Sequence, residues 1–174
     1  MLKKSLMIHV SSEARKENII FYRDYRITVL APRLFRLEQN KEKLFRDEPT
    51  QSVWYRNHPI QSFKTWLDEE GFHIATSEVE LILKEKREEA RLRMGEQIYP
   101  ITNDGNLKGT YRTLDGCNGG YFNENPPRKI VLNDGVCSLS GISYFDDASS
   151  LSLAANGEIL DKTGLGIDQY IFAY

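Results

Sequence analysis

Apolar residues alternate with polar ones along most of the chain, most clearly at Tyr25, Ile27 and Val29. Successive side chains of a strand point to opposite faces, so each such run predicts a strand with one apolar face toward a core. Further runs of this period occur at Ile19 and Phe21, Leu34 and Leu37, Phe72 and Ile74, Val79, Leu81 and Leu83, Ala90, Leu92 and Met94, Ile142 and Tyr144, Leu151 and Leu153, and Tyr170 and Phe172. Proline and glycine residues separate the runs at intervals typical of an all-β protein. We therefore expect an antiparallel β-sandwich.

Residues 78–94 allow two interpretations. The centre of this segment, KEKREEARL, consists of residue types that favour a helix. Its apolar positions nevertheless alternate on both sides of the charged centre, at Leu81 and Leu83 and again at Leu92 and Met94. The pattern favours a hairpin with a charged tip over an amphipathic helix.

Composition limits the class of protein. The chain has 174 residues, of which 40% are hydrophobic and 11% aromatic, so it can enclose one sizeable core. The sequence contains no internal repeat and no linker-like tract, and we expect a single domain over residues 1–174. The net charge of −2 gives no basic excess to attract nucleic acid. No segment approaches the roughly 18 apolar residues of a membrane span, so we expect neither nucleic acid nor membrane as partner.

Two features favour a cytoplasmic location. The apolar run near Met1 is shorter than the core of a signal peptide and is soon followed by charged residues. Cys117 and Cys137 are the only two cysteines, which is too few for a disulfide framework. We expect two free thiols in a reducing compartment.

The segment from 109 to 120 is the strongest candidate for chemistry. It holds four glycines in twelve positions, with Asp115 and Asn118 between them. Glycine lets a backbone adopt positive φ and approach a ligand closely. A carboxylate at Asp115 can accept hydrogen bonds from two adjacent sugar hydroxyls, and Asn118 can both donate and accept. The alternative is that Asp115 and Gly116 only form a tight turn, and the two roles are compatible.

Several segments, taken together, resemble one known family. Residues 113–116 read TLDG, and residues 134–147 read DGVCSLSGISYFDD. Residues 21–38 contain RITVL followed by RLFRLE, residues 45–57 contain FRDEPTQ, and residues 170–174 read YIFAY. In this order the segments resemble the N-terminal β-sandwich domain of glycoside hydrolase family 31, the α-glucosidase and α-xylosidase family. The resemblance covers the chain from about residue 19 to its last residue.

The resemblance implies a galactose-mutarotase-like sandwich that packs in cis on a catalytic (β/α)8 barrel. In such enzymes the barrel supplies the two carboxylates of a retaining mechanism that hydrolyses α-glycosidic bonds. Asp115, and with it Asn118, would contact an α-linked oligosaccharide at the mouth of the active site. The 174 residues contain no barrel strand, so we expect this chain alone to be inactive. We also expect an exposed apolar patch that faces the barrel and could support self-association.

Two other classes of protein remain open. A free-standing carbohydrate-binding sandwich would need a flat, exposed aromatic platform. A structural or adaptor sandwich would instead bury Asp115 in turn hydrogen bonds. The aromatic candidates for stacking on a sugar are Trp54, Trp66, Tyr111 and Tyr121, although aromatic side chains in a sandwich are more often core.

The sequence gives little sign of a metal or cofactor. Asp146 and Asp147 are adjacent carboxylates without a third ligand, in a position typical of a turn after a strand. The histidines show no ligand spacing, and we expect structural roles for them: His9, His58 and His73. No phosphate-binding loop follows the glycines. We expect no cofactor and no metal.

Overall fold

A computed structural model describes residues 10–109, 132, 134–154, 158–160 and 166–174. Within these residues the chain is built almost entirely of antiparallel strands, with two short 3-10 turns, η2 (Lys16–Asn18) and η3 (Arg87–Glu89). Asp115 and Asn118 lie outside the described residues, as do Tyr111 and Tyr121.

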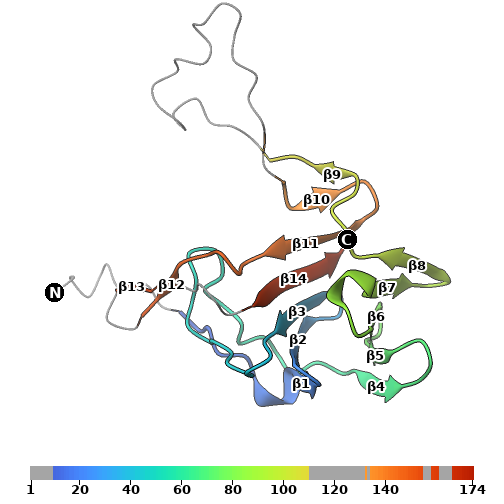
Figure 1. Cartoon of the computed structure of the whole chain (residues 1–174), viewed down its shortest axis with the longest axis horizontal. Helices are drawn as coiled ribbons and strands as arrows, with labels where there is room; N and C mark the ends of the chain where they lie inside the picture. Colours follow the sequence, from blue (N-terminus) through green and yellow to red (C-terminus); the bar gives the residue numbers. More distant parts are fainter. Residues whose placement is uncertain (1–9, 110–131, 133, 155–157, 161–165) are drawn as a thin grey trace, which may run out of the picture.

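The first sheet brings strands from the two ends of the sequence together (Figure 1). Its strands, in spatial order, are β1 (Ile19–Tyr22), β2 (Tyr25–Ala31), β3 (Leu34–Gln39), β14 (Ile167–Ala173) and β11 (Ile142–Asp146). In the pairing of β14 with β3, Ile171 lies opposite Phe35. The late strands β11 and β14 therefore complete a sheet that the first hairpins begin.

The second sheet is a meander in which each strand pairs with the next in sequence. Its strands are β4 (Lys64–Leu67), β5 (Phe72–Ala75), β6 (Glu80–Leu83), β7 (Arg91–Met94) and β8 (Gln97–Pro100). Two small pairs flank the sheets, β9 (Asn106–Leu107) with β10 (Cys137–Ser138), and β12 (Ser152–Leu153) with β13 (Ile159–Leu160).

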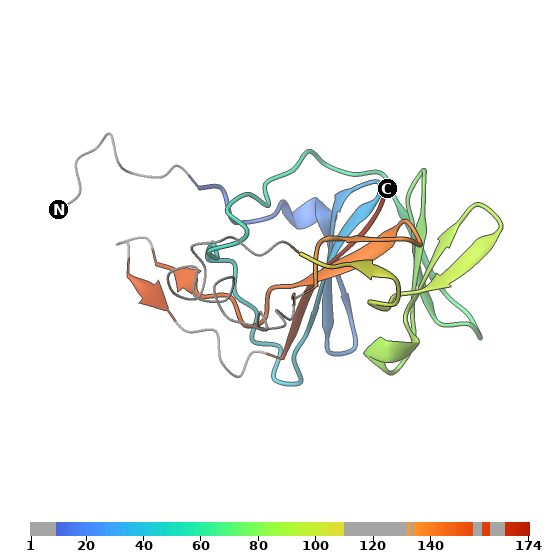
Figure 2. The same cartoon turned by 90° about the horizontal axis from the view of Figure 1, so that it is seen from above.

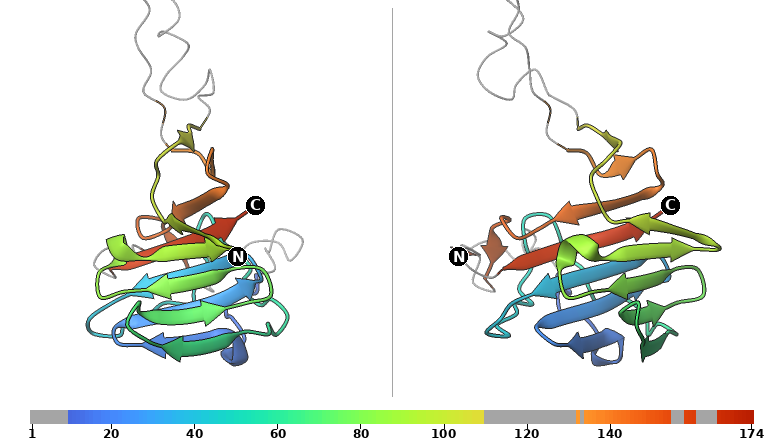
Figure 3. Two further views of the ribbon diagram at one scale, coloured as in Figure 1. Left: turned by 90° about the vertical axis from the view of Figure 1, so that its right-hand side faces the viewer. Right: turned by 45° about the vertical axis from the view of Figure 1, so that its right-hand side comes forward.

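The two five-stranded sheets stack face to face around one apolar core (Figures 2 and 3). The core takes every second residue of a strand, as the alternation predicts, for example Ile27 and Val29 from β2 and Leu81 from β6. The other buried members include Tyr25, Phe35, Leu37, Ile74, Val79, Leu83, Ala90, Leu92, Ile101, Ile142, Ile171 and Ala173. The prediction of an all-β antiparallel sandwich is confirmed.

Residues 78–94 form the predicted hairpin. Leu81 of β6 lies opposite Leu92 of β7, and η3 makes the turn between the two strands. Burial of the alternating leucines in the shared core outweighs the helix propensity of the charged residues at the tip.

Three predicted apolar faces differ from those observed. In β1 it is Ile20 and Tyr22 that pack against the core, while Phe21 is 66% exposed. In β14 it is Ile171 and Ala173 that reach the core, while Tyr170 lies on the opposite face, against buried arginines. In β12 the buried residue is Ser152, and Leu151 is 38% exposed. The reason in β14 is that both faces of the strand are covered, so its pattern does not reveal which face is the core.

Candidate functional site

The segment that carries Asp115 and Asn118 is bounded by described residues on both sides. On one side is β9 and on the other is β10, and these two strands pair with Leu107 opposite Cys137. The pair projects beyond the edge of the first sheet that is formed by β11 (Figure 1). The base of the candidate loop is therefore a defined part of the fold.

Hydrogen bonds and an ion pair hold β9 and the residues just before β10 together. The Nδ2 of Asn106 donates to the carbonyl of Gly135 at 2.9 Å, and the Oδ1 of Asn106 accepts from the Gly135 N–H at 2.8 Å. A Cβ on Gly135 would lie 2.2 Å from the carbonyl oxygen of Leu107, so only glycine permits this approach. Asp134 accepts from Asn103 Nδ2 at 2.9 Å and forms an ion pair with Lys108.

Residues of β10 and the turn after it contact Tyr174 at the end of β14. The Tyr174 hydroxyl accepts from the Ser138 N–H and donates to the Ser138 carbonyl oxygen. The Tyr174 N–H donates to the carbonyl of Gly141 at 3.0 Å. These contacts place the β9–β10 pair beside Tyr174 at the end of β14.

Exposed apolar residues lie on and beside the β9–β10 pair and at the end of β14. We call them the β9–β10 apolar cluster: Leu107, Val136, Leu139 and Tyr174, which are 50%, 59%, 80% and 52% exposed. Cys137 between them is also exposed. Single exposed apolar residues are ordinary, but a group of them marks a contact surface.

A second group of polar residues lies on the outer face of the first sheet, facing away from the core. Arg26 binds Glu38 through two hydrogen bonds of 2.6 and 2.8 Å, and Arg36 binds Asp168 through two of 2.8 and 2.9 Å. Arg36 also lies 3.1 Å from Glu38, which joins the two pairs. All four residues are nearly fully buried.

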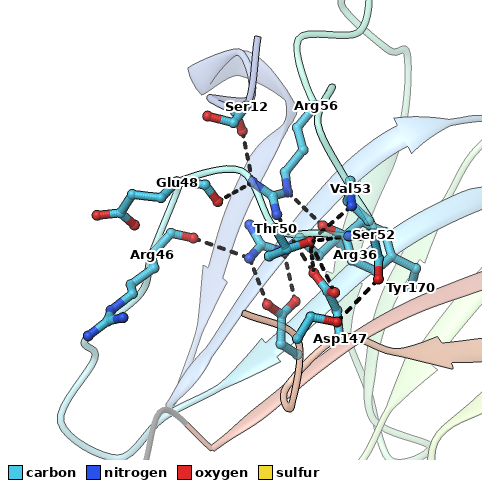
Figure 4. A network of polar contacts seen from close by, with 12 residues as sticks. Ser12, Arg36, Arg46, Glu48, Thr50, Ser52, Val53, Arg56, Asp147 and Tyr170 are labelled. Carbon is cyan, nitrogen blue, oxygen red and sulfur yellow. Dashed lines mark hydrogen bonds and ion pairs between the residues drawn. The ribbon is translucent and has the colours of Figure 1, made fainter. Parts of the chain in front are cut away.

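Residues 46–56 cover these pairs (Figure 4). The Nε of Arg56 donates to the Tyr170 hydroxyl at 2.6 Å, and its Nη1 donates to backbone carbonyls of residues 12, 47 and 48. The Thr50 hydroxyl lies 3.0 Å from Asp147 Oδ2. The covering segment therefore satisfies buried charges with its own backbone and side chains.

Arg36 stays charged at neutral pH. Burial disfavours the charged form of Arg36, but the carboxylates of Asp168 and Glu38 outweigh it and raise the pKa of the guanidinium. Burial raises the pKa of Tyr170 to about 12, although the nearby Arg36 and Arg56 oppose the shift. We regard the network as structural, because its members bind one another rather than face an open cleft.

The adjacent residues Asp146 and Asp147 have different environments in the structure. Asp147 is fully buried in the network just described, whereas Asp146 is exposed and accepts from the Ala148 N–H at 2.9 Å, as in a turn. Within the described residues no group of three or more His, Cys, Asp or Glu side chains is placed to hold a metal ion.

Sequence reasoning missed a third group, which we call the His73 cluster: Trp66, Asp68, His73, Glu80 and Arg93. His73 is buried, with Nδ1 2.5 Å from Glu80 Oε1 and Nε2 2.8 Å from Asp68 Oδ1. The Trp66 ring stacks on His73 with centroids 4.6 Å apart. The register of β4 against β5, which makes Trp66 and His73 neighbours, is the signal that would have revealed this cluster.

The remaining candidates from the sequence are one tryptophan and two histidines. Trp54 is partly buried, and its Nε1 has no hydrogen-bond partner within the described structure. His58 lies in the irregular segment before β4, and His9 falls outside the described residues. In the described part of the chain no helix has the length and apolar character to cross a membrane.

Comparison with known proteins gives no family. No protein-family model matches the chain, and no curated protein matches it.

Proposed function

We propose that this sandwich is the N-terminal domain of a family 31 glycoside hydrolase that hydrolyses α-glycosidic bonds with retention. The observation that carries the proposal is the position of the β9–β10 pair. The pair, between whose strands Asp115 falls in the sequence, contacts Tyr174, the last residue of the YIFAY segment, and carries exposed apolar side chains. A domain that supports a barrel and extends one loop toward its active site requires this arrangement.

In this proposal the sandwich has two tasks. The β9–β10 apolar cluster packs on a catalytic barrel in cis, where burial of its side chains stabilises the contact by about 25 cal/mol per Å² of apolar surface. Asp115 and Asn118 bind hydroxyls of an α-linked oligosaccharide. The barrel performs the covalent chemistry with its own two carboxylates. The two-cysteine composition supports a cytoplasmic setting.

The first test is genetic. We expect the reading frame that contains this chain to continue past Tyr174 into a barrel with paired aspartates, and the complete product to hydrolyse an aryl α-glucoside or α-xyloside. This chain by itself should give no turnover. A reading frame without a barrel, or turnover by this chain alone, would refute the proposal.

The second test concerns the loop. In the complete enzyme Asp115→Ala should lower kcat/KM on the active aryl glycoside by about 100-fold, corresponding to about 2.7 kcal/mol of transition-state stabilisation. Glu69→Ala, which changes an exposed carboxylate in the β4–β5 turn, is the matched control and should leave kcat/KM unchanged. Equal activity of the two variants would remove Asp115 from the substrate site.

A further inference from the structure

The outer face of the second sheet holds one flat aromatic ring in an unusual setting. Trp66 lies on the edge strand β4, and its ring stacks on His73 at an interplanar angle of 12°. His73 covers one face of the indole, yet Trp66 remains 39% exposed. One face of the ring is therefore covered, while part of Trp66 stays open to solvent.

The ring is held in place by hydrogen bonds. Its Nε1 donates to Asp68 Oδ2 at 3.1 Å, and Asp68 Oδ1 accepts from the Glu70 N–H at 2.8 Å and from His73. These bonds from Glu70, His73 and Trp66 outweigh partial desolvation and lower the pKa of Asp68, so its carboxylate is ionised at neutral pH. A ring fixed before binding loses little conformational entropy when a ligand stacks on it.

The surrounding groups select the class of ligand. Asp68 and Glu70 have side chains that are 45% and 61% exposed, and both can accept hydrogen bonds from hydroxyls. Arg93 bridges Glu70 and Glu80 at 3.0 and 2.7 Å and offsets part of their charge. The rim therefore keeps a net negative charge and offers acceptors, which suits the hydroxyl donors of a neutral saccharide and repels an acidic one.

We propose that Trp66, Asp68 and Glu70 form a surface site for one pyranose ring of a neutral saccharide. The apolar face of the sugar stacks on the indole, and its hydroxyls donate to the two carboxylates. The site lies on the second sheet, whereas Asp115 falls in the sequence between β9 and β10, which pair outside that sheet. It goes beyond the proposed function, and only the choice of an α-linked probe rests on that function.

The experiment is a titration of the ¹⁵N-labelled chain with maltotriose and, separately, with cellotriose, followed by NMR. We expect shifts of the Trp66 indole N–H and of the Glu70 and Gly71 amides, with a dissociation constant on the order of millimolar, because a single stacked ring without a cleft binds weakly. Shifts confined to other residues, or none with either sugar, would overturn the site. That result would leave the proposed function intact, since the reading-frame and Asp115 tests decide it.

Three variants make the assignment specific. Trp66→Ala should abolish the response, Trp66→Tyr should keep part of it, and Phe21→Ala, which removes a 66% exposed aromatic from the other sheet, should keep all of it. An unchanged amide spectrum outside β4 and β5 shows that each variant is folded. Retention of binding by Trp66→Ala would overturn the proposal.

Two further outcomes concern the identity of the ligand. Binding of tetramethylammonium at Trp66 without binding of either sugar would overturn the ligand class, because it would make the ring a cation site. A response to cellotriose alone would support the saccharide site and count against an α-glucan as its natural ligand.

Discussion

Both sheets carry ion pairs on their outer faces, but the pairs are buried on the first sheet and exposed to solvent on the second. On the first sheet, Arg36 and Asp168 are sealed beneath residues 46–56. On the second sheet, Arg93 and Glu70 lie at an open surface. The chemistry of the pairs is the same, and their access to water differs.

That difference changes what the charges do. A buried ion pair must recover a large desolvation penalty, so it persists only when several hydrogen bonds satisfy it, and loss of one partner is strongly destabilising. An exposed pair contributes little because water and salt screen it. The covered face therefore fixes how residues 46–56 pack on the sheet, and the open face is free to bind a ligand, as proposed for Trp66.

The largest expected effect comes from the covered face. Asp168→Ala leaves Arg36 buried without its two short hydrogen bonds, and should lower the free energy of unfolding by about 3–5 kcal/mol. Urea unfolding measures this loss, which should be the same in 0.1 M and 1 M NaCl because buried pairs are poorly screened. A loss below about 1 kcal/mol would show that Glu38 alone can hold Arg36.

Alkaline pH should act on the same face. The pKa of Tyr170 is raised by burial from 10.0 to about 12, so the folded state retains the phenolic proton after the unfolded chain has lost it. This contribution is fully present below pH 10 and is lost as pH rises from about 10 to 12, by about 2.7 kcal/mol for one tyrosine.

Urea unfolding between pH 8 and 12 checks the alkaline prediction. Tyr170→Phe lowers stability at pH 8, because Arg56 loses an acceptor, but it should flatten the fall above pH 10. Tyr25, whose pKa is also raised to about 12 by burial, remains in the variant and should leave part of the slope. An equally steep fall in the variant would show that Tyr170 is not responsible.

Hydrogen bonds of the covering segment should give an intermediate effect. The Thr50 hydroxyl contacts Asp147 at 3.0 Å and accepts from the Val53 N–H at 2.9 Å. Thr50→Val keeps the shape and removes these bonds, and should cost about 1–3 kcal/mol in urea unfolding. Thr65→Val on the exposed strand β4 is the matched control and should be nearly neutral, within about 0.5 kcal/mol. Equal losses would mean that covering the first sheet does not depend on Thr50.

The sequence predicted much of this architecture for a clear reason. In β2, β5 and the β6–β7 hairpin the core-facing positions are apolar and most of the opposite ones are polar, so period two reveals both the strand and its core side. β4 was missed because its four residues are all exposed, and only pairing with β5 makes it a strand. In β14 both faces are covered, so the pattern could not choose between Tyr170 and Ile171.

The functional residues were harder to predict for a related reason. Arg36 and Asp168 have the residue types of a solvated face, and only the irregular segment 46–56 buries them, which no local pattern reveals. The His73 cluster needs the register of four strands, β4 to β7, to bring its members together. The assignment of Asp115 and Asn118 to a substrate site came from the resemblance and stays a prediction.

The smallest effect is expected for an exposed pair at the edge of the sandwich. Arg33 forms an ion pair with Glu78, and their side chains are 50% and 41% exposed. Glu78→Ala should lower the free energy of unfolding by about 0.2–1 kcal/mol at low salt. In 1 M NaCl, where the screening length falls to about 3 Å, the difference from the parent chain should vanish. Urea unfolding at the two salt concentrations measures both values. A loss as large and as salt-independent as that of Asp168→Ala would mean that access to water does not separate the two kinds of pair.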